Sequence, residues 1–510
     1  MAAQQSWSFL LEGPFDWIDL GGDPGGFRVE MDAAGPWTPF RILDSHDQKL
    51  RQTGRALLQS GDQLTLLEAD HAPRCQPAGR GGDFPSDLPD GPVRKLTQKL
   101  FPLRCFLSQA TGHMQHSLLR VVGDEHKTRF QAEVARFQRC TDDAPVHVVT
   151  FSQPPGEERA LASMRRALMA HGAVDWTAER FATALALGAV SYVAKPETIF
   201  AEGDTAFDVA VQIIGNYIAV ARANEAGIIA DLDSEFLHDY RIALRKIRSV
   251  LSLFPGVFDS VETAELKATF AALMSPTGRL RDLDVYLMEQ ETYAILVPAR
   301  LRAGLQVMFD AFAEERNGCH ARLAQHLESP SYHRTMATLA DQLSHPAGLL
   351  RGKNGGVKAE AYARKRLWKR YRKICRIAEH IHDDTPDAEI HELRIACKKL
   401  RYLLEFFAPL FPAKRTRRVI KRMKRLQDNL GAFNDYCVQL DALARFVATN
   451  AALEGPRRRE ATRSIGALSA ALDQKRRVER ARVLENLDHF NGAATRADLL
   501  ALCRGKGVAA

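Results

Sequence analysis

The sequence predicts two parts of different fold class: an α+β N-terminal domain containing an antiparallel β-sheet or barrel, and an all-α C-terminal domain. Three observations lead to this prediction. Short apolar segments separated by turn residues fill the first 150 residues, helical periodicity begins near Asp204, and one 17-residue motif occurs twice. A chain of 510 residues is also too long for a single ordinary core.

The N-terminal region has the pattern of short strands. Ser60, Gly61 and Asp62 interrupt one apolar segment and predict a hairpin turn, and the Pro-, Gly- and Asp-rich stretch 71–92 predicts a surface loop. Strands are expected over 6–12, 26–31, 39–43, 55–67, 117–122, 128–134 and 146–151. Helices are expected over 159–171 and 176–194, which together with the strands gives the α+β class.

A self-comparison reveals a duplication in the helical region. Residues 238–254 read HDYRIALRKIRSVLSLF and residues 391–407 read HELRIACKKLRYLLEFF, with 8 of 17 positions identical at a separation of 153 residues. Both segments carry an apolar seam with spacings of three and four, which is typical of a helix in a bundle. The seams consist of Leu237, Tyr240, Leu244, Ile247, Leu251 and Phe254, and of Ile390, Leu393, Cys397, Leu400, Leu404 and Phe407.

This duplication defines the predicted domains. We expect an N-terminal domain over 1–200 and a helical domain over 201–495. The helical domain is predicted to consist of two pseudo-symmetric four-helix bundles, at about 201–345 and 357–495, joined by the loop 344–356.

Basic side chains follow each seam at steps of three, four and three, so they share one helical face. The first row is His238, Arg241, Arg245 and Arg248, and the second is His391, Arg394, Lys398 and Arg401. Each row is roughly 15 Å long at the helical rise per residue. Arginine can bind two phosphate oxygens at once, so such rows suit an extended phosphate chain. A solvated helix face is the alternative, but the row occurs twice and borders a buried seam.

The charge distribution points in the same direction. The net charge is +8, yet residues 351–430 alone carry 23 Lys and Arg against 9 Asp and Glu. A polyanionic partner is therefore expected for this segment, with binding that weakens in salt. The candidate set includes further cations near the two rows: Lys246, Arg281, Lys369, Lys373, Lys399 and Lys424.

Several classes of protein are excluded by what the sequence lacks. No apolar stretch has the ~18–20 residues of a membrane helix, and the N-terminus lacks the pattern of a secretory signal. The eight cysteines show neither CxxC nor zinc-ligand spacing. We expect reduced thiols, a cytoplasmic location, no metal, no cofactor and no membrane partner.

At the two motifs the sequence resembles the CHAD family, the conserved histidine α-helical domain. His238–Arg248 and His391–Arg401 match its His-x-x-Arg-x-x-x-Arg-(Arg/Lys)-x-Arg helix. The segment 278–282 is similar to its Gly-x-x-Arg-Asp turn, and Asn434 with Asp435 occupies that place in the second copy. The resemblance covers about 200–495 and implies two four-helix bundles that bind inorganic polyphosphate, often at polyphosphate granules.

Residues 1–200 resemble a degenerate CYTH domain, the triphosphate-tunnel fold. The segment from Leu43 to Leu57 is similar to a conserved part of that family. Its Glu-x-Glu-x-Lys motif is reduced to Glu12, however, and Leu58 and Gln59 replace the expected arginine pair. Metal-dependent phosphate hydrolysis needs opposed carboxylates for the ions. No catalytic residue is therefore predicted, and the protein is expected not to be an enzyme.

Three functions follow from these observations. The favoured one is a non-catalytic protein that binds polyphosphate, with the two motif helices facing each other across a basic cleft. The first alternative is a triphosphatase or nucleotide hydrolase that uses the N-terminal domain. The second is a nucleic-acid-binding protein, since basic helices also contact DNA and RNA backbones, although the rows contain no interleaved aromatic residues for base stacking.

Overall fold

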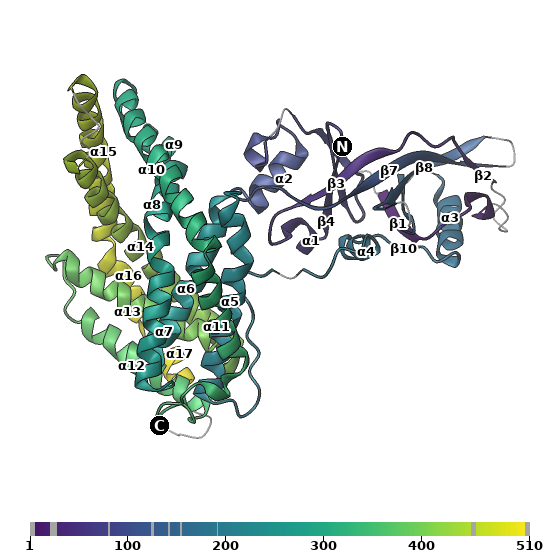
Figure 1. Cartoon of the computed structure of the whole chain (residues 1–510). Coiled ribbons are helices and arrows are strands. Elements are labelled where there is room, and N and C mark those ends of the chain that lie inside the picture. The colour runs from purple at the N-terminus through teal and green to yellow at the C-terminus, as the bar shows by residue number, and fades with distance from the viewer. Residues whose placement is uncertain are drawn as a thin grey trace. The chain divides into compact units, whose positions relative to one another are not determined.

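The structure is a computed structural model, drawn in Figure 1. It describes residues 6–20, 28–79, 82–123, 127–140, 143–152, 156–190, 192–449 and 455–504. The chain divides into two compact units, Met1–Ala194 and Lys195–Ala510. Positions 26 and 27 of one expected strand lie outside the described residues.

The N-terminal unit is built on a ten-stranded sheet in the order β10-β1-β9-β8-β7-β3-β4-β5-β6, with β2 pairing with β7. The strands of the described residues pair in antiparallel orientation throughout. The strands are β1 Ser6–Glu12, β2 Arg28–Met31, β3 Thr38–Asp44, β4 Arg55–Ser60, β5 Gln63–Glu68, β6 Arg74–Pro77, β7 Leu107–Val122, β8 Thr128–Gln138, β9 Val146–Ser152 and β10 Val174–Asp175. The antiparallel sheet predicted from the sequence is therefore present.

Most of the predicted elements of this unit are confirmed. The hairpin turn joins β4 to β5, with Ser60 opposite Gln63 and Gly61 at φ 56°, and α3 (Glu158–Ala170) matches the first predicted helix. The second predicted helix is much shorter, since α4 spans only Ala178–Ala184. The loop predicted over 71–92 was partly wrong because it contains β6.

Helices cover both faces of the sheet. Alternate residues of a strand point to opposite faces, so Phe9 and Phe151 share one core with Met164 of α3. On the other face, Leu10 shares a second core with Phe181 of α4. Two separate apolar layers therefore hold this sheet.

The sheet is open, which corrects the barrel alternative. In the described residues its outermost strands are β10 and β6, and these two do not pair. The helix α2 (Pro92–Leu100) packs against β6 instead. Gln76 of β6 donates its side-chain amide to Pro89 O at 2.8 Å and accepts from the backbone N–H of Val93 at 3.0 Å. A helix covers this edge, so no strand closes it.

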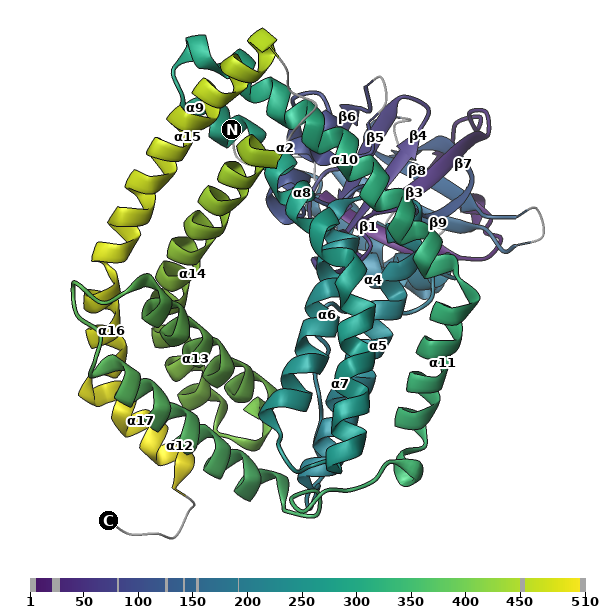
Figure 2. The ribbon, with the colours of Figure 1, turned by 60° about the vertical axis from the view of Figure 1, so that its left-hand side comes forward.

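The second unit is helical. Its first half contains α5 Ala206–Ile229, α6 Ser234–Leu253, α7 Ser260–Met274, α8 Gly278–Met288, α9 Gln290–Leu296, α10 Arg302–Glu328 and α11 Pro330–Ser344. Its second half contains α12 Ala359–Ala378, α13 Asp387–Phe406, α14 Ala413–Thr449, α15 Gly455–Ala481, α16 Val483–Asn491 and α17 Ala493–Cys503. Figure 2 shows these helices from a second side.

Helix boundaries recur at the separation found in the sequence. The helices α6 and α13 begin and end 153 residues apart, as do α10 and α15, and α5 and α12 begin 153 residues apart. One break differs. Pro276 lies in a 3₁₀ turn between α7 and α8, whereas Asn429 occupies the corresponding position inside the continuous α14. Proline lacks the backbone N–H that a helix interior requires.

Equivalent residues of the two halves meet at one line. Ala206 N–H donates to Val357 O at 2.8 Å, and Ala359 N–H donates to Asp204 O at 2.9 Å, which is the same bond at the 153-residue separation. The rings of Phe254 and Phe407, also equivalent, stack at 4.7 Å with planes 10° apart. Equivalent helices pack on each other as well: α5 on α12, α6 on α13 and α10 on α15. A pseudo-twofold axis therefore passes between the halves.

Both predicted seams are buried. All twelve seam side chains are at most 3% exposed. The two seams end at the stacked Phe254 and Phe407, so the apolar face of each motif helix continues into the contact between halves.

Truncating this ring pair should destabilise the helical unit. For Phe254→Ala we expect a loss of about 3–5 kcal/mol in unfolding free energy, because a buried phenylalanine leaves a cavity that cannot fully collapse. Urea unfolding followed by helical circular dichroism measures it. Ile295→Ala is the control, since Ile295 is 76% exposed. A loss below about 1 kcal/mol for Phe254→Ala would show that the stack contributes little.

Candidate functional site: the paired motif helices

Both basic rows lie on helices whose starts are fixed by local contacts. At the start of α6, the Asp233 carboxylate accepts backbone N–H bonds from Glu235 and Phe236 at 2.9 and 3.2 Å. Such a cap satisfies donors that the first turn leaves without partners. Arg281 of α8 adds a bond from its guanidinium to Ser234 O at 3.2 Å. The first row is thereby held at its N-terminal end from two sides.

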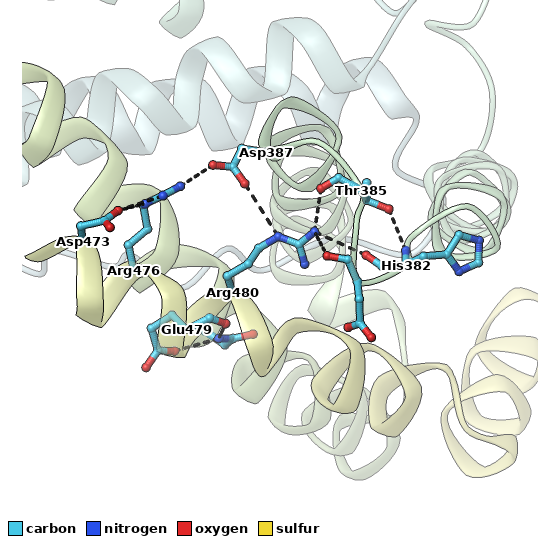
Figure 3. A network of polar contacts seen from close by, with 9 residues as sticks. His382, Thr385, Asp387, Asp473, Arg476, Glu479 and Arg480 are labelled. Atoms are coloured by element: carbon cyan, nitrogen blue, oxygen red, sulfur yellow. Dashed lines mark hydrogen bonds and ion pairs between the residues drawn. The ribbon is translucent and has the colours of Figure 1, made fainter.

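The start of α13 is held by α15 instead (Figure 3). Arg480 donates to Thr385 O at 2.6 Å, in the loop that precedes α13. Arg476 bridges Asp387, at 2.6 Å, to Asp473 of its own helix, at 2.9 Å. These arginines are neutralised by carboxylates and position the second row.

The two rows come together near the axis. Arg245 and Lys398 are equivalent residues, and burial together with Arg245, Arg394, Arg401 and Lys246 lowers the pKa of Lys398 to about 8. Cations from both halves therefore surround one lysine. In the described residues, none of Arg245, Arg394 and Lys398 forms an ion pair with a carboxylate. We call Arg245, Arg394 and Lys398 the axial cluster.

Lys246, which lies beside the first row, has a different environment from the residues of that row. Its ammonium forms an ion pair with Glu405 of α13 and lies 4.3 Å from the centre of the Tyr402 ring. Burial lowers the pKa of Lys246, while Glu405 opposes that shift. This lysine joins the two motif helices, and its charge is already compensated.

Arg241 and Arg248 of the first row contact the turn after α7 and α7 itself. Arg241 donates to Thr277 Oγ1 at 2.5 Å, and burial, with Arg245 nearby, lowers its pKa. Arg248 is exposed, with Nη1 3.2 Å from Met274 Sδ. His238, on the first turns of α6, is partly buried. The row thus runs from the start of α6 to the axis.

The second row contacts α14. The Nδ1 atom of His391 lies 2.8 Å from Asn434 Oδ1, so the histidine and the asparagine singled out in the sequence are in contact. Arg401 pairs with Glu405 at 3.1 Å. Glu405 therefore serves two cations, Arg401 and Lys246.

The remaining candidates lie away from the axial cluster. Burial and the neighbouring Arg370 and Lys373 lower the pKa of Lys399, which places it against α12. Lys373 pairs with Glu392 at 2.8 Å. Lys369 of α12 and Lys424 of α14 are exposed on their helices. The structure thus gathers part of the candidate set at the axis and leaves Lys369, Lys373 and Lys424 apart from it on α12 and α14.

The pseudo-symmetry is broken where charge is compensated. Tyr402 and Glu405 of α13 correspond to Ser249 and Ser252 of α6. Near Tyr402 and Glu405 lies Tyr217, whose pKa burial raises to about 12; its counterpart at the 153-residue separation is Arg370. One side of the axis thus has an acid and two tyrosines, and the other has two serines and an arginine.

Sequence reasoning missed Glu405, Tyr402 and Arg370. All three occupy positions at which the two copies differ in charge or size. Positions at which the two copies differ in charge or size could therefore have indicated these residues, whereas a comparison of identical positions could not.

The N-terminal unit holds a buried acid with a structural role. Asp44 accepts backbone N–H bonds from Ser45, Leu50 and Arg51 at 2.7 to 3.0 Å, and burial raises its pKa to about 6. It thereby caps the short helix α1 (Lys49–Gln52). No group of three or more His, Cys, Asp or Glu side chains that could hold a metal ion occurs in the described residues of the chain.

No helix among the described residues is both long and apolar enough to span a membrane.

One family model agrees with the resemblance found in the motifs. Residues 212–444 match the family model of the CHAD domain. No curated protein matches the chain. The CHAD domain from the plant Ricinus communis is similar in structure, with a TM-score of 0.48 and 26% identity over 62% of this chain and 98% of that one. PptA from Streptomyces chartreusis gives a TM-score of 0.38 and 17% identity over 55% and 98%.

The shifted pKa of Lys398 predicts a pH-dependent cost of the axial cluster. The ammonium of Lys398 loses its proton near pH 8 in the folded chain but only near pH 10.5 in the unfolded chain. Between these values the unfolded chain holds one more proton, so the free energy of unfolding rises with pH. Lys398→Met should therefore raise the thermal midpoint at pH 7, and its advantage over the native chain should shrink toward pH 10.

Differential scanning calorimetry from pH 7 to 10 measures this effect. Lys414→Met, on the exposed start of α14, is the matched control and should leave the pH profile unchanged. An advantage of Lys398→Met that stays constant across this range would contradict the shifted pKa.

Proposed function

On the premise of a CHAD domain at residues 212–444, we propose that this protein binds inorganic polyphosphate through the paired motif helices. One observation carries the proposal: the axial cluster places uncompensated cations from both halves around Lys398. Holding like charges together costs folding free energy. A bound polyanion would compensate these charges, and a phosphate chain supplies one negative charge or more per repeating unit.

The chemistry of the rows supports a phosphate chain over a single small anion. Arginine binds two phosphate oxygens in a fork and lysine adds a point charge. Arg241 and Arg245 lie four residues apart on α6, and Arg394 and Lys398 repeat that spacing on α13, so cations recur about every 6 Å along each helix. In our proposal the chain passes over the axis and contacts both rows, which belong to two four-helix bundles.

The broken symmetry supports an asymmetric path for the chain. Glu405 already compensates Lys246 and Arg401 on one side. On the other side lie Lys399, Arg370 and Lys373, and among the described residues only Lys373 has an ion-pair partner, Glu392. We propose that the phosphate chain continues from the axial cluster toward Arg370 of α12 and the neighbouring Lys399 of α13.

We further propose that the protein is not an enzyme and acts in the cytoplasm at polyphosphate granules, as the family resemblance implies. In this proposal the N-terminal unit is a degenerate CYTH-like domain without triphosphatase activity. The open sheet and the structural role of Asp44 support it, because a tunnel for triphosphate requires a closed barrel with acids that face its interior. Metal-dependent hydrolysis of nucleoside triphosphates by the purified chain would overturn this part.

The proposal predicts that the axial pair is essential for binding. Arg245→Gln combined with Lys398→Gln should weaken polyphosphate binding about a hundredfold or more, since each charge-assisted contact contributes ~1.5–3 kcal/mol. The salt dependence should also become shallower, because fewer counterions are displaced. Titration with labelled long-chain polyphosphate at several salt concentrations measures both effects.

The matched control removes two exposed cations, Lys414 and Lys421 of α14, by the same substitution to Gln. It should cost much less, because these groups act mainly through a screened field. If both double variants lost polyphosphate affinity equally, with parallel salt dependence, the rows would bind polyphosphate no more specifically than any other positively charged surface. Duplex DNA at equal phosphate concentration should compete poorly, and preference for DNA would favour the nucleic-acid alternative.

Adding a carboxylate to α6, so that both motif helices carry an acid at equivalent positions, should weaken polyphosphate binding. Ser252→Glu places a carboxylate at the position equivalent to Glu405. It should reduce polyphosphate affinity about threefold to tenfold with little effect on stability, because Ser252 is exposed. Ser249→Gln is the uncharged control. Unchanged affinity in Ser252→Glu would show that the phosphate chain does not follow the α12 side.

A further inference from the structure

A cavity lies between α12, α16 and α17, on a face of α12 that differs from the one bearing Arg370. Its volume is about 520 Å³, and it is lined by Trp368, Tyr371, Arg372, Cys375, Arg376, Glu379, Asn491 and Arg496. Pockets of this size are typical of small-molecule sites. Arg372 follows Arg370 by two positions, so it lies about 200° round the helix from it. The cavity therefore opens away from Arg370, which the proposed path of polyphosphate follows.

The lining combines aromatic rings with positive charge. Arg372 lies 6.0 Å from the centre of the Trp368 ring, and the Trp368 and Tyr371 rings are 5.9 Å apart. Arg372, Arg376 and Arg496 contribute three positive charges against the single acid Glu379. Aromatic faces and arginine guanidinium planes are the groups on which flat bases stack.

These three arginines differ from their neighbours because none of them forms an ion pair within the part of the chain that the structure describes. Arg418 and Arg422 share Asp498 of α17, and Arg425 pairs with Glu485 of α16. Carboxylates of α16 and α17 therefore neutralise the arginines of α14 that pack against them. The arginines that line the cavity keep their positive charge, which is available to an anionic ligand.

Polar contacts hold the floor of the cavity in one arrangement. Asn491 Oδ1 accepts from the Tyr371 hydroxyl at 3.3 Å and from the Cys375 thiol at 3.5 Å. Asn491 ends α16, and the next residue, Gly492, is the N-cap of α17 without a side-chain bond. The first turn of α17 thus begins beside the lining residue Arg496, and helix N-termini favour anions.

The duplication provides an internal control. At the 153-residue separation, Trp368, Arg372, Arg376 and Arg496 correspond to Gly215, Ala219, Ala223 and Leu343. The first half packs α5 against the single helix α11 without an aromatic or basic side chain at these positions, of which Ala219 and Ala223 are exposed. The aromatic and basic set is therefore a feature of the second half alone and is not required for packing helices in this way.

From these observations we infer that the cavity binds a small anion attached to a flat heteroaromatic ring, the chemistry of a mononucleotide. The ring stacks against Trp368 and Arg372, and the phosphate lies between Arg496, Arg376 and the start of α17. This site is separate from the axial cluster and does not depend on polyphosphate binding.

Trp368 provides the probe, because the other four tryptophans lie at positions 7, 17, 37 and 176. Titration of the full chain with AMP should quench tryptophan fluorescence saturably, and Trp368→Phe should abolish the change. Equilibrium dialysis with labelled AMP measures affinity independently of the fluorescence. Arg372→Gln combined with Arg496→Gln should weaken binding at least tenfold, while Arg463→Gln, an exposed arginine of α15, should leave it unchanged.

Each other outcome decides against the inference. Absence of saturable AMP binding up to millimolar concentration overturns it. Equal affinity for ribose 5-phosphate shows a plain anion site without ring recognition, and equal loss in Arg463→Gln shows generic charge. If Arg245→Gln with Lys398→Gln removes AMP binding, the nucleotide occupies the axial cluster. That result would overturn the present inference without touching the proposed function, which polyphosphate titration tests separately.

Discussion

The meeting of equivalent residues across one axis is the constraint on which the helical unit depends. The symmetric pair of backbone bonds at Ala206 and Ala359 and the stacked rings of Phe254 and Phe407 fix the two halves at equivalent points. Any residue near such an axis meets its own counterpart. A cation placed there on one motif helix is therefore brought toward the cation of the other, as Arg245 is toward Lys398. Duplication of one basic helix thus concentrates positive charge at the axis, and no additional basic motif is needed.

The same constraint explains why the copies have diverged where they have. Perfect symmetry would repeat every repulsion, and a buried charge without compensation is costly. Glu405 and Tyr402 relieve Lys246 on one side, whereas Ser252 and Ser249 leave the other side without an added acid. Divergence at these four positions changes the electrostatics of the site while the apolar seams stay closed. Packing and charge are therefore separable along the motif helices.

Much of this organisation could be predicted from the sequence, for identifiable reasons. The repeat at 153 residues and the seam spacing predicted α6 and α13, because period and identity are local properties of the chain. The N-terminal hairpin at Gly61 followed from turn chemistry in the same way. The open edge of the sheet did not, because it depends on α2 and Gln76 covering β6 across a separation in sequence. Glu405 was missed because its ion pair with Lys246 joins two different helices, and the sequence alone does not show that these helices are in contact.

The two charged regions of the second half also show how function can be separated from folding in a duplicated protein. Where arginines serve packing, as at Asp498 or Asp387, a carboxylate lies within bonding distance. Where they do not, at the axial cluster and in the cavity beside Trp368, the helices that carry them are held by other means: buried seams, the Arg476 and Arg480 contacts, and the Asn491 bonds. The scaffold therefore tolerates uncompensated charge because its stability comes from elsewhere. A set of cations that folding does not require, on helices that folding has already fixed, is preorganised for an anion and loses little conformational entropy when it binds one.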